Sequence, residues 1–187
     1  ISLKPSQLGL DIDVDFCYEN LKEIVALAND YQIFVNFDME NYARLYPSFD
    51  LLEQLNAEYG NVGTVIQAYF FESDDNIERF KDYRLRLVKG AYKEDPSVAF
   101  QDKFDIDRKF IAQIEYHLLH GKFTSIATHD HNIINHVKQF VKQHDIPKDK
   151  FEFQMLYGFR TDMQLSLVKE GYNFCTYVPF GEDWYGY

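Results

Sequence analysis

The chain has 187 residues, of which 46% are hydrophobic and 17% are aromatic. This composition is typical of a packed globular protein and excludes a disordered one. The formal net charge of -11 argues against nucleic acid as a partner, because an acidic surface repels phosphate. Two cysteines and no apolar run long enough to cross a bilayer favour a protein of the reducing cytoplasm.

Short apolar segments alternate with longer amphipathic ones along the whole chain. The short segments are rich in Val, Ile, Phe and Tyr, as buried parallel strands are. We predict strands at residues 1–4, 33–38, 64–70, 85–89, 124–128, 151–154 and 172–177.

Helices are predicted between these strands, because apolar residues recur there at helical spacing. Leu21, Val25 and Ala28 lie on one face of the first long helix. The apolar positions within 133–141 follow the same spacing, and Asp130 is placed to cap the start of that helix.

Three glycines each follow a predicted helix and precede a strand. They are Gly60, Gly121 and Gly171. Glycine commonly ends a helix in the left-handed conformation, so we expect all three to adopt it.

Seven strands separated by six helical segments predict repeated βα units with parallel strands. No Gly-x-Gly-x-x-Gly follows any strand, so the fingerprint of a doubly wound dinucleotide-binding sheet is absent. We therefore predict an α/β fold, a (βα)8 TIM barrel that lacks its first strand and last helix in this sequence. No domain boundary is visible, so residues 1–187 are expected to form one domain, a fragment of a catalytic barrel.

Polar side chains gather where the predicted strands end, which is the catalytic rim of a TIM barrel. A charged group in a short apolar strand is costly unless it is paired or bound to a ligand. These ends are therefore candidates for a binding site. They carry Lys4, Asp38, Gln67, Arg86, Lys89, Thr128, His129, Gln154 and Tyr177.

Each of these residues also has an ordinary structural explanation. Lys4 and Asp38 would suit a buried ion pair, and Gln67 would suit hydrogen bonds to nearby backbone. Arg86 and Lys89 are three residues apart, so strand alternation predicts that they point to opposite faces. The tyrosines at the rim would equally suit packing in a core.

A metal site is an alternative for the segment around residue 129. His129 and His131, with Asp38 from another strand end, resemble the ligands of a metal-dependent TIM-barrel hydrolase. However, Asp130 is well placed as a helix cap, and the other histidines fall in predicted helices. We therefore rank this interpretation below the one that follows.

Seven segments, in order and across the whole chain, resemble the proline dehydrogenase family in its monofunctional bacterial form. They read LKPSQLG, FDME, QAY, RLVKGAY, ATHD, FEFQMLYG and YVPFG, and they occupy residues 3–9, 37–40, 67–69, 86–92, 127–130, 151–158 and 177–181. The resemblance implies a distorted TIM barrel that holds FAD at its rim. It also implies oxidation of L-proline to 1-pyrroline-5-carboxylate, the first step of proline catabolism. Hydride would pass to the flavin and electrons to a quinone.

The resemblance assigns roles residue by residue. Asp38, Arg86 and Tyr177 correspond to catalytic positions, with Arg86 donating to the flavin nitrogen that accepts hydride. Positions that contact proline correspond to Lys4, Tyr92 and Leu156. Positions that contact FAD correspond to Met39, Gln67, Lys89, Gly90, Ala91, Thr128, His129 and Gln154.

The sequence departs from the family pattern near its end. In the family, two adjacent arginines on the last helix clamp the substrate carboxylate, and no Arg-Arg pair occurs before Tyr187. We therefore expect this sequence alone to have little activity and to retain FAD weakly, and an inactive barrel fragment is a third interpretation. A quinone acceptor further implies peripheral contact with the inner face of the membrane.

Overall fold

The structure is a computed structural model that describes residues 1–181. It contains a strand at each of the seven predicted places, although the ends differ by a few residues. The strands are β1 (Ser2–Leu3), β2 (Val35–Phe37), β3 (Val62–Gln67), β4 (Arg84–Val88), β5 (Phe123–Ala127), β6 (Phe151–Leu156) and β7 (Phe174–Tyr177). The last six residues, at the end where the sequence departs from the family pattern, lie outside the described part.

All neighbouring strands are parallel, and the sheet follows chain order from β1 to β7. The register pairs Asn36 with Gly63, Arg86 with Ser125, and Gln154 with Cys175. A parallel sheet in chain order requires a crossover of the same hand after each strand, which is how a TIM barrel is built. The α/β barrel fold predicted from the sequence is therefore confirmed for these seven strands.

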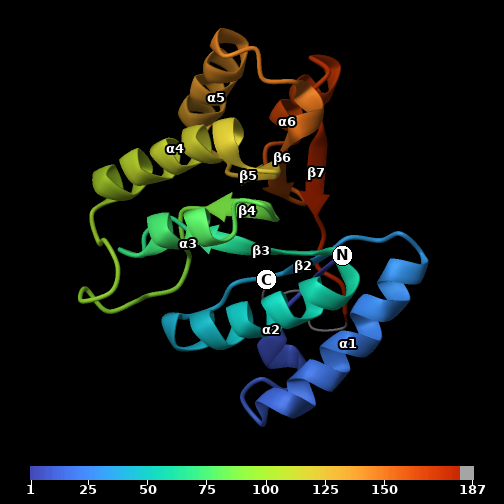
Figure 1. The fold of residues 1–187 in the computed structure, drawn as a ribbon. Helices are drawn as coiled ribbons and strands as arrows, with labels where there is room; N and C mark the ends of the chain where they lie inside the picture. The colour runs from blue at the N-terminus through green and yellow to red at the C-terminus, as the bar shows by residue number, and fades with distance from the viewer. Residues whose placement is uncertain (182–187) are drawn as a thin grey trace.

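Helices connect the strands and cover the outer face of the sheet. Figure 1 shows α2, α3, α4 and α5 following one another along the same side of the strands, with α1 beside α2. The helices are α1 (Val14–Asp30), α2 (Leu45–Tyr59), α3 (Ser73–Arg79), α4 (Lys103–His120), α5 (His131–Gln143) and α6 (Thr161–Lys169), with short 3-10 turns η1 (Pro5–Leu8), η2 (Tyr42–Arg44) and η3 (Lys148–Lys150).

Local chemistry sets the ends of several helices. Asp13, Asp102 and Asp130 each accept a hydrogen bond from a backbone N–H in the first turn of α1, α4 and α5. Such caps satisfy N–H groups that have no partner inside the helix. The predicted cap at Asp130 is thus confirmed.

The three helix-ending glycines behave differently from one another. Gly60 and Gly171 adopt the expected left-handed conformation, with φ of 72° and 79°. The prediction for Gly121 is wrong, because its backbone is extended at φ -89°. A Cβ at Gly121 would lie 2.3 Å from Nε2 of His117, so glycine is needed there for close packing.

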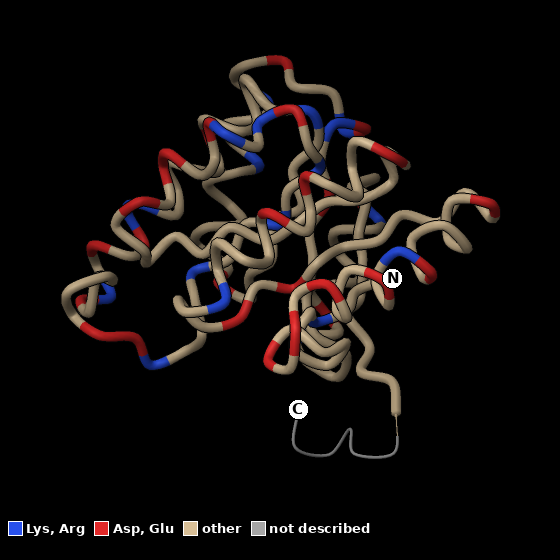
Figure 2. Tube along the Cα trace, turned by 60° about the horizontal axis from the view of Figure 1, so that its bottom comes forward, with Lys and Arg blue, Asp and Glu red and all other residues tan. Residues whose placement is uncertain are grey.

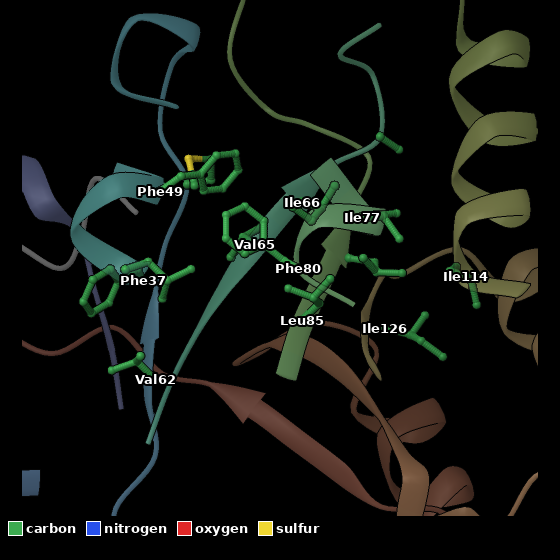
Figure 3. Packing of buried hydrophobic residues seen from close by; sticks show 14 of the residues in the cluster. Phe37, Phe49, Val62, Val65, Ile66, Ile77, Phe80, Leu85, Ile114 and Ile126 are labelled. Atoms are coloured by element: carbon green, nitrogen blue, oxygen red, sulfur yellow. The ribbon is translucent and has the colours of Figure 1, made fainter. Parts of the chain in front are cut away.

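The hydrophobic core lies between the sheet and the outer helices (Figure 3). Phe37 from β2, Phe49 from α2 and Phe80 after α3 are fully buried there. The rings of Phe49 and Phe80 pack 4.6 Å apart between centroids. Burying aromatic rings of this size supplies much of the free energy of folding.

The opposite, inner face of the sheet is polar. Alternation along each strand points apolar side chains such as Phe37 outward, toward the helices. The side chains adjacent to them in sequence point inward. The inward-facing set includes Asn36, Asp38, Arg84, Arg86, Ser125, Glu152 and Gln154, which line one continuous hollow. Buried polar groups in such number must satisfy one another or a ligand.

Most charged positions outside this hollow follow the outer helices and loops (Figure 2). None of the helices within residues 1–181 has the length and apolar character needed to span a membrane.

Candidate active site

A cavity of about 880 Å³ opens at the carboxyl ends of the strands. All fourteen residues singled out from the sequence line it. They are Lys4, Asp38, Met39, Gln67, Arg86, Lys89, Gly90, Ala91, Tyr92, Thr128, His129, Gln154, Leu156 and Tyr177. The volume and the mixed lining fit a site for a small molecule or cofactor.

Asp38, just after β2, is the central acceptor of the site. Its Oδ1 accepts a hydrogen bond from Nη1 of Arg86 at 2.5 Å. Its Oδ2 accepts from the hydroxyl of Tyr177 at 2.7 Å and lies 3.3 Å from Nζ of Lys4. The ion pair that the sequence allowed between Lys4 and Asp38 therefore exists, and both of its members face the cavity.

Arg86 is held by acceptors on every nitrogen. Besides Asp38, its Nε donates to Oε1 of Gln154 at 2.6 Å and its Nη2 donates to Oγ of Ser2 at 2.7 Å. The guanidinium also lies 5.4 Å from the centre of the Tyr177 ring. A side chain bonded at three nitrogens has one orientation, which is the requirement for a group that acts on a bound ligand.

Two cations meet Asp38 at this end of the cavity. Lys4 and Arg86 each form an ion pair with its carboxylate, and both side chains are mostly buried, so solvent screens these charges weakly.

Lys89 corrects one expectation from the sequence. Strand alternation was predicted to point it away from Arg86, but β4 ends at Val88 and both cations line the cavity. Nζ of Lys89 forms ion pairs with Asp107 at 2.5 Å and with Asp130 at 3.2 Å. The charge of Lys89 is therefore balanced within the protein.

The two acids beside Lys89 are stabilised in their ionised form. Burial opposes ionisation of Asp130, but hydrogen bonds from Lys89 and from the backbone of Asn132 hold its pKa below the ordinary value. Burial likewise opposes ionisation of Asp107, whose pKa is lowered by Lys103 and Lys89. Asp130 thus has two roles, as cap of α5 and as partner of a cavity cation.

The loop after β4 forms one wall of the cavity. Gly90 adopts φ 119°, and a Cβ there would lie 2.4 Å from the ring of Tyr69. Tyr69 is buried beneath the loop, as expected for a core aromatic, whereas Tyr92 is 38% exposed and lines the cavity. The bare backbone at Gly90 lets the loop pass close over Tyr69.

Gln67 and Thr128 also form internal hydrogen bonds at the rim. Nε2 of Gln67 donates to the backbone oxygen of Glu40 at 2.8 Å, which confirms the structural explanation offered by the sequence. Oγ1 of Thr128 accepts from the backbone N–H of Asp130 at 3.1 Å. Both side chains hold loop backbone in place while they line the cavity.

His129 serves as an acceptor. Its Nε2 accepts a hydrogen bond from the backbone N–H of Leu156 at 3.1 Å, so the ring proton resides on Nδ1 of the neutral ring. Burial, together with nearby Arg160, lowers the pKa of His129. The ring is therefore neutral at physiological pH.

The metal-site alternative finds no ligand set in the part of the chain that the structure describes. There, no group of three or more His, Cys, Asp or Glu side chains is placed to hold a metal ion. Asp38 is bonded to Arg86 rather than to a histidine, and His131 is exposed at the start of α5. The hydrolase interpretation is therefore not supported.

Sequence reasoning missed several residues of the inner network, among them Ser2 and Glu152. Ser2 bonds Arg86, and Glu152 bonds Gln154. Glu152 carried a usable signal, because it lies two residues before Gln154 and alternation places both on one face. No sequence signal pointed to Ser2.

Comparisons with known proteins agree with this arrangement. A family model described as proline dehydrogenase matches residues 1–183. Proline dehydrogenase 2 of Bacillus subtilis is 49% identical over 189 residues, covering 100% of this chain and 62% of the relative. Proline dehydrogenase of Deinococcus radiodurans is 42% identical over 194 residues, covering 100% and 63%. This chain thus spans less than two thirds of the length of these curated relatives.

Solved structures show the same fold. The crystal structure of proline utilization A (PutA) from Bdellovibrio bacteriovorus, inactivated by N-propargylglycine, matches with a TM-score of 0.86 and 25% identity. The match covers 97% of this chain and 22% of that one. A Bradyrhizobium japonicum PutA mutant matches with a TM-score of 0.82 at 23% identity, which supports the fold alone.

Proposed function

Because the chain belongs to the proline dehydrogenase family, we propose that it forms the FAD-binding, proline-oxidising barrel of such an enzyme. The observation that carries the proposal is the cluster of Lys4, Asp38, Arg86 and Tyr177 at the rim of the cavity. This cluster brings two cations to the cavity and holds the guanidinium of Arg86 in one orientation.

The donors in the cavity fit a flavin. Arg86, Lys89 and Gln67 bring positively charged and amide groups to one cavity, which suits the carbonyl and nitrogen acceptors of an isoalloxazine ring. Gly90 lets its loop pack closely against Tyr69, which holds the loop backbone along the cavity wall where a planar ring would lie. We propose that these residues hold FAD, together with Met39, Ala91, Thr128, His129 and Gln154.

The remaining wall fits proline. The carboxylate of proline is an anion, so the cations Lys4 and Arg86 would attract it and orient the ring. Tyr92, Leu156 and Tyr177 line the cavity beside these cations and would position the ring and exclude water. Asp38 fixes Lys4, Arg86 and Tyr177 relative to one another.

The proposed reaction removes two electrons from proline. The substrate would lose a hydride from the ring carbon next to nitrogen that does not carry the carboxylate, and a proton from nitrogen to solvent, which gives 1-pyrroline-5-carboxylate. FAD held by Arg86, Lys89 and Gln67 would supply the hydride acceptor, and a membrane quinone is the proposed final acceptor. A quinone acceptor places the protein in the cytoplasm with peripheral contact at the inner face of the membrane.

The test is an anaerobic titration of the full chain, loaded with FAD, with L-proline. With excess FAD present to offset weak retention, we expect flavin absorbance to bleach slowly on addition of proline. The Arg86→Met variant should bleach at least about a hundredfold more slowly, because it removes the fixed cation from the site.

Arg79→Met is the matched control, since Arg79 forms an ion pair with Glu53 on the outer helices, away from the cavity. It should bleach at the rate of the unaltered chain. If FAD binds but proline does not bleach it, the proposal that proline is the substrate is contradicted. Failure to bind FAD would favour the inactive-barrel interpretation.

A further inference from the structure

A chain of hydrogen bonds runs beneath Arg86 on the inner face of the sheet. Glu152 and Gln154 lie two residues apart on β6 and are 9% and 6% exposed. Nε2 of Gln154 donates to Oε1 of Glu152 at 2.6 Å, and Oε1 of Gln154 accepts from Nε of Arg86 at 2.6 Å. One amide therefore links a buried carboxylate to the cation of the proposed site.

The chemistry of the two neighbours permits only one orientation of this amide. An ionised carboxylate only accepts hydrogen bonds, and a guanidinium only donates them. Gln154 must therefore turn its NH2 group toward Glu152 and its oxygen toward Arg86. The flipped amide would set two acceptors against each other on one side and two donors on the other.

Glu152 is itself firmly anchored. Its Oε1 also accepts from Nη2 of Arg84 at 2.6 Å and from Oγ of Ser125 at 2.8 Å. Arg84 lies 4.7 Å from the ring centre of Phe34 and 4.2 Å from that of Phe123. The ion pair with Arg84 compensates the burial of the carboxylate, so Glu152 can remain charged beneath the cavity.

We infer that Glu152 is a positioning residue for Arg86 and acts through Gln154. Its charge fixes the amide of Gln154, and the fixed amide oxygen sets the direction of the Arg86 Nε–H bond. Asp38 and Ser2 accept hydrogen bonds from the two Nη groups of Arg86. Gln154 accepts from Nε of Arg86 and therefore fixes the direction of that third N–H bond. The effect of this arrangement on FAD rests on the proposed function.

The first test observes Arg86 directly, without cofactor. In the ¹⁵N spectrum of the FAD-free full chain, the Arg86 Nε–H signal is assigned by its loss in Arg86→Lys. Glu152→Gln should shift this signal and speed its exchange with water, because an amide at 152 can face Gln154 with either end.

Ser125→Ala is the matched control, because it removes a different hydrogen bond to the same carboxylate oxygen. It should leave the Arg86 signal in place. An Arg86 signal that is the same in Glu152→Gln as in the unaltered chain would overturn the inference.

If Glu152→Gln folds poorly, exchange at the Arg86 Nε–H is measured instead in the double variant Glu152→Gln/Gln154→Glu, in which the two side chains are swapped. It keeps one carboxylate and one amide in the pair and gives Nε of Arg86 an acceptor again. Recovery of slow exchange at Arg86 is expected. Continued fast exchange in a folded protein would contradict positioning by this pair.

The second test is a double-mutant cycle on FAD binding. Glu152→Gln should weaken FAD binding by about tenfold, as expected for a displaced charge-assisted hydrogen bond. It should have no further effect in a Gln154→Ala background. Equal effects in both backgrounds would overturn action through Gln154. If the unaltered chain binds no FAD, the proposed function fails, while the Arg86 signal still decides the positioning role.

Discussion

At the scale of single residues, Asp38 connects parts of the barrel that are far apart in sequence. It accepts from Arg86 in β4 and from Tyr177 at the end of β7, 139 residues away, and it pairs with Lys4 after β1. All of these partners point inward, so their charges share one poorly solvated space. This one carboxylate therefore connects three side chains of the site.

Replacing that carboxylate by an amide tests this connection. Asp38→Asn keeps the shape but removes the counter-charge that Asp38 supplies to both Lys4 and Arg86. Breaking a buried pair in this way should lower the free energy of unfolding by about 2–4 kcal/mol. Urea unfolding measures the change, and an Asp38→Asn variant as stable as the unaltered chain would contradict this role.

The matched control is Glu58→Gln, which breaks an ion pair with Lys22 on the outer helices. Both partners are substantially exposed, so solvent already screens the attraction between them. The free energy of unfolding of this variant should be nearly unchanged.

The sequence predicted the site residues well where a charge interrupts an apolar strand. Arg86 and Asp38 stand out for that reason, and both lie in the cavity. It could not predict Ser2, because a serine near a strand is unremarkable until the structure places Arg86 beside it. Lys89 was misjudged because alternation holds only within a strand, and β4 ends one residue earlier.

At the scale of elements, the loop after β4 carries much of the proposed cofactor site. Its course depends on Gly90, which combines φ 119° with contact against the Tyr69 ring. Gly90→Ala should therefore lower the free energy of unfolding by about 1–3 kcal/mol and weaken FAD binding. Thermal unfolding and FAD titration measure the two effects.

The Gly60→Ala variant separates the effect of backbone strain from the effect of a steric clash. Gly60 also has positive φ, at 72°, but nothing lies within 4 Å of a Cβ placed there. Its variant should show the backbone cost alone and bind FAD normally. If both variants bound FAD equally well, the close approach over Tyr69 would have no bearing on the site.

The existence of the strands could be predicted, but their ends could not. The strand predicted at 64–70 ends at Gln67, and the chain turns at Ala68 and Tyr69. Oγ of Ser73 donates to the backbone oxygen of Phe70 at 2.8 Å, which stabilises that turn. The aromatic side chains of Tyr69 and Phe70 are buried in the core. A sequence pattern cannot distinguish an aromatic residue buried in a turn from one buried in a strand.

At the scale of the whole molecule, the outer helices depend on their attachment to the sheet, and His117 provides one such attachment. It is fully buried on α4, and its Nδ1 lies 2.8 Å from Oγ1 of Thr124 on β5. Gly121 provides the space for its ring. Burial lowers the pKa of His117 from 6.5 to about 4, so the folded protein keeps this ring neutral.

The lowered pKa makes the stability of the fold depend on pH. Below pH 6.5 the unfolded chain binds a proton at His117 that the folded chain does not, so the free energy of unfolding falls as pH falls toward 4. Between pH 7 and pH 5 this histidine should account for a loss of about 2 kcal/mol. His117→Gln should lose less stability over that interval than the unaltered chain, as measured by urea unfolding at both pH values. His120→Gln, at an exposed position of the same helix, should lose as much as the unaltered chain. Identical losses in all three proteins would show that other groups cause the acid sensitivity.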